Sequence, residues 1–427
     1  MNQFVSTKQI ARETLTRLCD NLVFPNLIYR DDGGNRSVKK GDTVQVRRPV
    51  RLEAKEFSGD TGIEPQNLVE EAVDVKLDTI ASVDIELSAI EAACDMDSLT
   101  RLFLEPAAAA LAEKINADGL GLYRDIRQSC GTPGTLPDSL SAFADASLLL
   151  DEAKVPTDRR CAVWSPYATS RLKQIPAVVS AQACGSTKAL RTGNIGCVFG
   201  LENYMSQAVV NHIAGSLAGT SYTLTVTAKS AGSVEITASA SSGTVSISGK
   251  TLVCGDLLLA DDYTLLVSAD CTASSATKIT VPVDAASYAA AKIGDTVTVA
   301  PSHDANLVFH PHAFAFVTRP LATPAGVESY VTSYNGISLR VVRAYDVRYK
   351  KEILSMDVLY AFKTVYPELA VRWRREPFKS SLRRVPRCCR CFCTRRIPRR
   401  LQGTRWQSGG RRYVARSITS PAKTTVP

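Results

Sequence analysis

The fold of this 427-residue chain is decided by two runs near its carboxyl end, Asn306-Leu-Val-Phe-His-Pro-His-Ala-Phe-Ala-Phe-Val-Thr-Arg-Pro320 and Gly336-Ile-Ser-Leu-Arg-Val-Val-Arg-Ala-Tyr-Asp346. They lie in a stretch, residues 306–371, that is rich in predicted strands. The Asn335-Gly336 pair predicts a hairpin, because type I′ turns prefer Asn-Gly. Pro367 is expected to end the last strand and Val371 to close the folded body.

A second informative run lies upstream, Leu190-Arg-Thr-Gly193-Asn-Ile-Gly196-Cys-Val-Phe-Gly200, followed by Glu202-Asn-Tyr. Its glycine spacing fits neither the Gly-x-Gly-x-x-Gly dinucleotide fingerprint nor the phosphate loop, which needs Gly-Lys-Ser/Thr. We expect these glycines to permit tight turns between short strands.

The remaining elements alternate between strand and helix, which predicts an α+β or α/β class. Residues 42–48 and 72–87 alternate apolar and polar side chains, as strands with one solvent-exposed face do. They enclose a long charged excursion, which we interpret as an arm lying on a neighbouring subunit; an ordinary surface hairpin is the alternative. A short helix and an arm are predicted in 4–30, longer helices at 97–127 and 140–154, a buried strand at 160–166 and a helix at 167–174.

The composition changes sharply at about residue 215. Residues 215–300 are rich in Ser, Thr, Ala and Gly and poor in charge, and their short strands recur at regular spacing. This pattern predicts a small β-sandwich or barrel, inserted into a flanking domain that resumes after 301. The predicted strand runs begin at Tyr222, Ser233, Thr244, Leu257, Thr277 and Thr296.

The net charge of +9 is unevenly distributed. Residues 372–427 contain 17 Lys or Arg and one acid, which leaves 34 basic and 41 acidic residues in 1–371. Nucleic-acid binding by the whole chain is therefore excluded, and only the tail is basic enough for it. The tail has no apolar period, and four of the twelve cysteines crowd into it. It is interpreted as out-of-frame translation, with a disordered basic tail or a metal-binding tract as alternatives.

The sequence contains no catalytic constellation and no complete metal or cofactor site. His310 and His312 would share one face of a strand, but no third ligand accompanies them. Cys184 has no histidine partner in sequence, and the scattered cysteines are expected to be small buried hydrophobes. No apolar run is long enough to span a membrane, and the first residues lack the apolar core of a signal peptide, so a cytoplasmic location is expected.

The two quoted runs, in this order, resemble the central domain of tailed-phage major capsid proteins, in particular the coat proteins of short-tailed Salmonella phages, which have the Hong Kong 97-type capsid fold. The phrase Leu104-Glu-Pro-Ala-Ala-Ala-Ala-Leu-Ala112 is similar to the spine helix of that family. The resemblance covers roughly residues 5–371, and the tail departs from it.

The resemblance implies an α+β capsid fold with an inserted all-β domain. Its parts would be an N-terminal arm (1–30), an extended loop (31–75), a peripheral domain with the spine helix (76–134), an axial domain (135–214 and 301–371), the insert (215–300) and the tail (372–427). The extended loop would contact a neighbouring subunit through Lys39, Lys40, Arg47, Arg48, Arg51 and Glu53.

The function implied by the resemblance is self-assembly into the icosahedral head of a tailed double-stranded DNA phage, as a procapsid that later expands. The implied partners are other copies in pentamers and hexamers, a scaffolding protein, a portal at one vertex and packaged DNA bound without sequence specificity, and no membrane. The protein would be found in the virion, and in the host cytoplasm during assembly. No enzymatic activity, cofactor or lysine–asparagine crosslink is expected. A surface adhesive β protein and a cysteine hydrolase remain the alternative classes.

Overall fold

The structure is a computed structural model of the chain. We refer to residues 215–300 as the β segment and to the other described residues as the body. All described residues belong to one unit, which ends at Phe378. The structure describes residues 7–31, 39–48, 71–87, 100–131, 137–185, 187–219, 221–240, 245–346 and 351–375.

Two helices pack against each other at the start of the body. The longer one, α4, forms where Pro106 precedes a run of alanines, because proline suits a first helical turn and alanine has the highest helix propensity. The buried Asn116 side chain of α4 accepts hydrogen bonds from the backbone N–H groups of Val23 and Phe24, which fixes where the N-terminal helix ends. The helical elements here are α1 (Thr7–Asn21), α2 (Phe24–Leu27), the π-turn η2 (Thr100–Leu104), α4 (Glu105–Leu120) and the 3₁₀ turn η3 (Gly121–Asp125).

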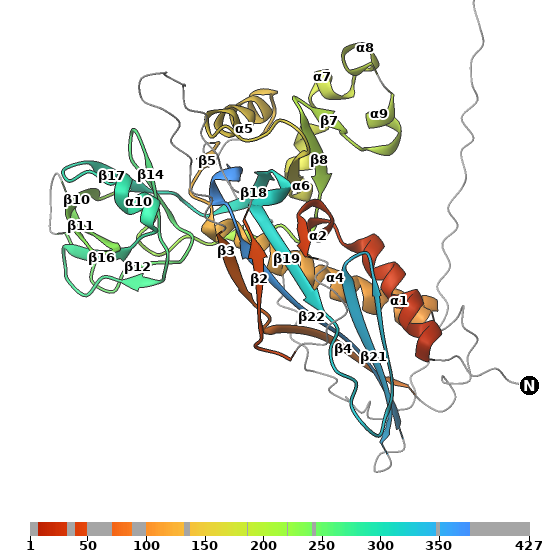
Figure 1. The fold of residues 1–427 in the computed structure, drawn as a ribbon. Helices are drawn as coiled ribbons and strands as arrows, with labels where there is room; N and C mark the ends of the chain where they lie inside the picture. The colour runs from red at the N-terminus through yellow and green to blue at the C-terminus, as the bar shows by residue number, and fades with distance from the viewer. Residues whose placement is uncertain are drawn as a thin grey trace, which may run out of the picture. The chain divides into compact units, whose positions relative to one another are not determined.

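The first sheet of the body has six strands, and α1 and α4 lie alongside it (Figure 1). Its order is β1-β19-β22-β21-β20, and β4 also pairs with β22. Asn335 and Gly336 join β20 to β21 with φ values of +50° and +71°, which confirms the predicted hairpin. The strands are β1 (Tyr29–Asp31), β4 (Thr79–Leu87), β19 (Phe314–Arg319), β20 (Glu328–Tyr334), β21 (Ile337–Asp346) and β22 (Lys351–Thr364).

The second sheet of the body has seven strands in the order β5-β23-β18-β6-β8-β7, with β9 paired to β18. All five residues of β6 are buried, which confirms the buried strand predicted there. The strands are β5 (Ser129–Cys130), β6 (Arg160–Trp164), β7 (Cys197–Val198), β8 (Leu201–Met205), β9 (Asn211–His212), β18 (His303–Phe309) and β23 (Ala370–Arg375).

Short helices surround this second sheet. The predicted helix at 140–154 is observed as α5, in which Phe143, Ala146 and Leu150 are fully buried and Leu148 is exposed. Pro166 begins a helix here, because proline suits a first helical turn. The elements are α5 (Ser141–Glu152), α6 (Pro166–Leu172), α7 (Pro176–Val179), α8 (Ala181–Cys184), α9 (Lys188–Thr192) and the 3₁₀ turns η4 (Pro311–Ala313) and η5 (Pro367–Leu369).

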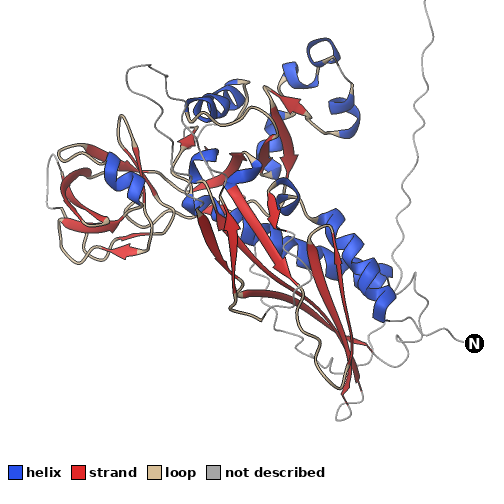
Figure 2. Cartoon of the chain, viewed as in Figure 1, coloured by secondary structure: helices blue, strands red, loops and turns tan. Residues whose placement is uncertain are grey.

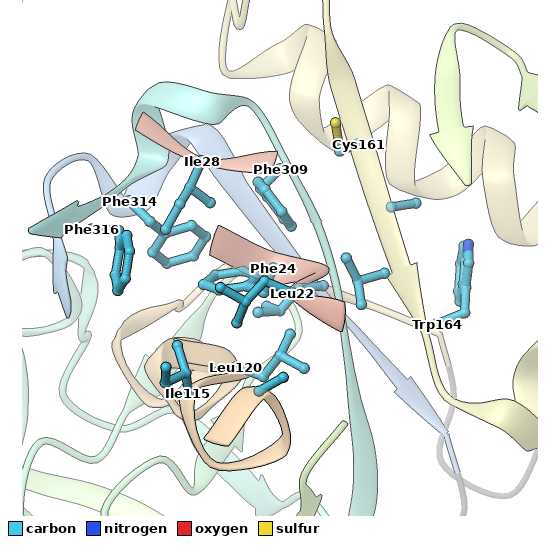
Figure 3. Packing of buried hydrophobic residues seen from close by; sticks show 14 of the residues in the cluster. Leu22, Phe24, Ile28, Ile115, Leu120, Cys161, Trp164, Phe309, Phe314 and Phe316 are labelled. Atoms are coloured by element: carbon cyan, nitrogen blue, oxygen red, sulfur yellow. The ribbon is translucent and has the colours of Figure 1, made fainter. Parts of the chain in front are cut away.

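The body has one large apolar core, to which segments far apart in the chain contribute. Phe24 packs against Phe309 and Phe314, with ring centroids 5.4 and 5.5 Å apart. Figure 3 shows these rings meeting above α4, with Trp164 further along the same cluster. The first quoted run therefore supplies the centre of the core, as its apolar content predicts.

The β segment has its own apolar core, built only from residues between Leu217 and Val297. Apart from one short helix, the regular structure of the described part of the segment consists of strands (Figure 2). The prediction of an all-β segment needs one correction, since Asp284 caps the short alanine-rich helix α10 within it. Its elements are β10 (Thr223–Ser230), β11 (Ser233–Ser239), β12 (Thr251–Leu252), β13 (Leu257–Leu259), β14 (Thr264–Leu266), β15 (Cys271–Thr272), β16 (Lys278–Pro282), α10 (Ala285–Ala290) and β17 (Thr296–Val299).

The structure corrects three other predictions, two about strands and one about where the tail begins. Residues 72–87 form two strands rather than one, β3 (Ala72–Lys76) and β4, because their pairing partners differ. The described residues 245–247 are not a strand, although Ile247 is buried in the segment's core. The tail does not begin at 372, since β23 continues to Arg375 and Arg372 is fully buried. A charge count cannot detect burial, which is why the sequence placed this boundary too early.

Candidate assembly surfaces

The first candidate surface is the hairpin of β2 (Thr43–Arg47) and β3. Val46 and Val75 share one face, which packs on β19 and β22 through Val317 and Leu359. The hairpin is therefore attached to the body by an apolar face, as its alternating sequence predicts. The opposite face is exposed and carries Thr43, Gln45, Arg47, Asp74 and Lys76.

The predicted contact residues lie at different places on this hairpin. Lys39 and Lys40 are exposed at the turn that precedes β2, and Arg47 is exposed at the end of that strand. Arg51 and Glu53 lie outside the described residues. The structure thus brings three predicted basic residues to the surface of one hairpin, and their contact with a neighbouring subunit stays a prediction.

Arg48 contacts its own body, and its predicted contact with a neighbouring subunit stays a prediction. Its guanidinium donates to the backbone oxygen of Val365 at 2.5 and 3.2 Å and to Glu71 at 2.8 Å. It also lies 4.8 Å from the centroid of the Tyr366 ring. Arg48 therefore holds the hairpin against its own body, and a positive charge in sequence does not reveal which way the side chain turns.

The second candidate surface is formed by the glycine-spaced run and the helices before it. Gly193, Gly196 and Gly200 have φ values of +69°, +73° and +75°, so these glycines do serve tight turns, as predicted. The buried Asn203 side chain donates to the oxygen of Gly196 and accepts from the Trp164 indole, which fixes the turn to the body. These two hydrogen bonds anchor the glycine-spaced run to the body.

Large apolar side chains are exposed on this surface. Leu190 is 72% exposed, Phe199 55% and Met205 45%. Phe199 lines a hollow of about 410 Å³ and Met205 lines a second of about 270 Å³, and the two hollows share Asn194 and Ile195 in their walls. We name this the 177–205 surface. Exposed large apolar side chains near such hollows are typical of a protein–protein contact.

The conformation of Phe199 adds to this observation. Its φ value is +49°, a left-handed conformation that costs a non-glycine residue about 1 kcal/mol or more. The strained turn between β7 and β8 nevertheless presents the phenyl ring outward rather than burying it. Phe199 and Gly200 are the two central residues of the hairpin turn that joins Val198 to Leu201, and two-residue hairpin turns of type I′ require positive φ at both positions.

The raised pKa values of four described cysteines argue against nucleophilic catalysis by these thiols. Burial raises the pKa of Cys130 to about 12 and the pKa values of Cys19, Cys161 and Cys271 to about 11. Each of these thiols is therefore protonated at neutral pH, whereas a cysteine nucleophile needs a depressed pKa. The cysteine hydrolase alternative is disfavoured at these four positions.

The predicted histidine pair is close together, but it is not on a strand. His310 precedes the 3₁₀ turn η4, and its imidazole accepts a hydrogen bond from the backbone N–H of His312 at 3.4 Å. In the described ranges, no group of three His, Cys, Asp or Glu could hold a metal ion. Across those same ranges, no helix combines the length and apolar character that crossing a membrane requires.

The comparisons with known proteins give structural neighbours only. No protein-family model matches the chain, and no curated protein matches it. Solved structures that are similar include one of Mycobacterium phage Che8, 17% identical with a TM-score of 0.44, covering 82% of this chain and 90% of that one.

Two further similar structures come from different sources. The capsid of the cyanophage P-SCSP1u is 13% identical with a TM-score of 0.41, covering 83% of this chain and 88% of that one. The virus-like particle from Pyrococcus furiosus is 8% identical with a TM-score of 0.37, covering 86% and 98%. All three TM-scores lie below 0.5, so the function proposed next rests on the residues described above.

Proposed function

We propose that this chain is a major capsid protein that assembles, in many copies, into the head of a tailed phage. The single observation that carries the proposal is the 177–205 surface, where the exposed Phe199 borders a hollow of about 410 Å³ that is lined mainly by apolar residues. A neighbouring copy would cover the exposed side chains of Leu190, Phe199 and Met205.

The order of the parts supports the same function. An N-terminal helix, a hairpin with an exposed charged face, a long alanine-rich helix, the 177–205 surface and the β segment follow each other along the chain. This is the order that the sequence resemblance implies for a Hong Kong 97-type subunit. In this assignment α4 is the spine helix, 31–75 the extended loop, and 215–300 a domain inserted into the axial domain of 135–214 and 301–371.

The finer parts of the proposal concern the assembly. The 177–205 surfaces of five or six copies would meet around an axis, while Lys39, Lys40 and Arg47 would contact the next subunit. Each single contact can be weak, because every subunit makes several at once. A scaffolding protein, a portal, packaged DNA and membership in the Salmonella-phage family belong to the same proposal, with the virion as final location.

Sedimentation velocity and negative-stain microscopy of the full chain would test this function. The chain would be produced in bacteria, alone and together with the product of the neighbouring gene as a candidate scaffold. We expect fast-sedimenting closed shells, or tubes and spirals of regular rings. A chain that stays strictly monomeric under both conditions would contradict the proposal and favour the adhesive class.

A further inference from the structure

Buried polar groups, rather than apolar ones, join the β segment to the body. In the described part of the chain, the core cluster of the body contains no residue of the β segment, and the cluster of the segment contains none of the body. The contact between them instead includes Tyr123, His212, Asp256 and Arg372, which are between 0% and 2% exposed. We name these four residues the polar latch.

Asp256 is the acceptor on the side of the β segment. One of its carboxylate oxygens lies 2.8 Å from Nε2 of His212, and the other accepts from the backbone N–H groups of Val253 at 2.7 Å and Gly215 at 3.1 Å. Nδ1 of His212 lies 2.9 Å from the hydroxyl of Tyr123. With Nε2 donating to the carboxylate and Nδ1 accepting from the phenol, the chain of hydrogen bonds is complete.

The position of this carboxylate is significant because the chain enters the β segment here. His212 ends β9, which pairs with β18 where the chain leaves the segment again. Gly215 follows three residues after β9, and a Cβ at this position would lie 2.2 Å from the backbone oxygen of Thr251. The entering chain is thus packed directly on the segment and held there by Asp256.

Arg372 is a member of the polar latch that comes from the body and hydrogen-bonds to both parts. Its guanidinium donates to the backbone oxygen of Gly255 in the β segment at 2.8 Å. It also donates to the backbone oxygens of Tyr123 and Ile126 in the body at 2.7 and 3.1 Å, and it lies 4.9 Å from the Tyr123 ring centroid. One side chain of the last described strand therefore binds both parts, and among the described residues no ion pair to a carboxylate is formed by it.

We propose that the polar latch is a conformational coupling device, which holds the β segment on the body only when strand β23 is in place. The apolar core of the segment gives it a fold of its own, so releasing the latch would free its attachment without melting its strands. Because a buried acceptor left without its donor is strongly unfavourable, loss of one member should loosen the others. This inference does not depend on the proposed function.

Hydrogen exchange of the full chain, followed by mass spectrometry, tests the coupling. The variants are Asp256→Asn, which keeps the shape of the side chain, and Arg372→Met, which keeps much of its volume. We expect the backbone amides of 213–216 and 253–256 to exchange at least about tenfold faster in both variants, while β10 and β11 keep their protection. Arg319→Ala is the matched control, because Arg319 is a buried arginine of the body that pairs with Asp31 away from the latch.

Two results would overturn the proposal. In the first, both latch variants leave the exchange of 213–216 and 253–256 as in the wild type. In the second, β10 and β11 lose protection by the same factor as the latch segments, so that the segment unfolds with its attachment. Selective loosening in the Arg319→Ala control would also contradict it, since that change touches no member of the latch.

Discussion

The core of the β segment comes from one continuous stretch, Leu217 to Val297, whereas the core of the body brings together residues from Ile10 to Trp373. The core of the β segment can form from contacts that are close in sequence, whereas the core of the body needs contacts between residues from both ends of the chain. The two regions therefore differ in what holds them, and the attachment between them is polar. This difference predicts that a change in one region can weaken that region without weakening the other.

The largest effect is expected in the body. Phe309 is fully buried and packs against Phe24 and Phe314, so Phe309→Ala should lower the free energy of unfolding by roughly 3–5 kcal/mol. Denaturant titration measures the loss, and hydrogen exchange locates it. Leu148→Ala is the control, since this side chain is 56% exposed and should change stability by less than about 0.5 kcal/mol.

A comparable change in the β segment should stay inside it. Ile236 is fully buried on β11, and Ile236→Ala should cost roughly 2–5 kcal/mol of local stability. Amides of β10, β11 and β16 should then exchange faster, while those of β18 and β23 keep their protection. Equal loss of protection in both regions would mean that the two cores unfold as one.

The pH dependence of stability is expected to come partly from His303, which lies at the junction. Burial lowers the pKa of His303 from 6.5 to about 3. The unfolded chain takes up this proton as the pH falls through about 6.5, whereas the folded chain does not until about pH 3. Stability therefore falls with decreasing pH in this window, by about 1.4 kcal/mol per pH unit once the unfolded histidine is charged.

Unfolding of the wild type and of His303→Gln between pH 7 and pH 4 checks this prediction. The other titrating groups are present in both proteins, so the difference between the two curves reports His303 together with its interactions with neighbours such as His212. The difference should grow steadily as the pH falls. Parallel curves would show that this histidine is not held neutral in the folded chain.

The smallest expected change in stability has the largest expected consequence for assembly. Phe199→Gly removes the left-handed strain and should stabilise the isolated subunit by up to about 1 kcal/mol, while weakening association. Asn335→Gly is the matched control, since Asn335 also has a positive φ, at a hairpin turn far along the chain. Thermal unfolding and sedimentation would be compared, and an assembly-competent Phe199→Gly variant would remove Phe199 from the contact.

The sequence predicts local patterns in this fold well. The hairpin at Asn335-Gly336, the buried strand β6 and the short strands of the β segment follow from turn residues and periodicity. The division of 72–87 into β3 and β4 could not be predicted, because it depends on which distant strand each half pairs with.

The candidate contact residues and the polar latch were likewise predictable only where a local pattern reveals them. Exposure of Lys39 and Lys40 was predictable from a polar turn, whereas the inward course of Arg48 was not. The polar latch leaves no signal in the sequence, because Arg372 begins a stretch rich in basic residues, and Asp256 and His212 are 44 positions apart with no motif to join them. Long-range pairing of single charged residues leaves no periodic signal in one sequence.

Electron cryomicroscopy of assembled particles tests the central claim most directly, since that claim places the 177–205 surface between copies of this chain. The account predicts that Leu190, Phe199 and Met205 are buried against a neighbouring copy around a symmetry axis. Particles in which these side chains face solvent in every copy would contradict it.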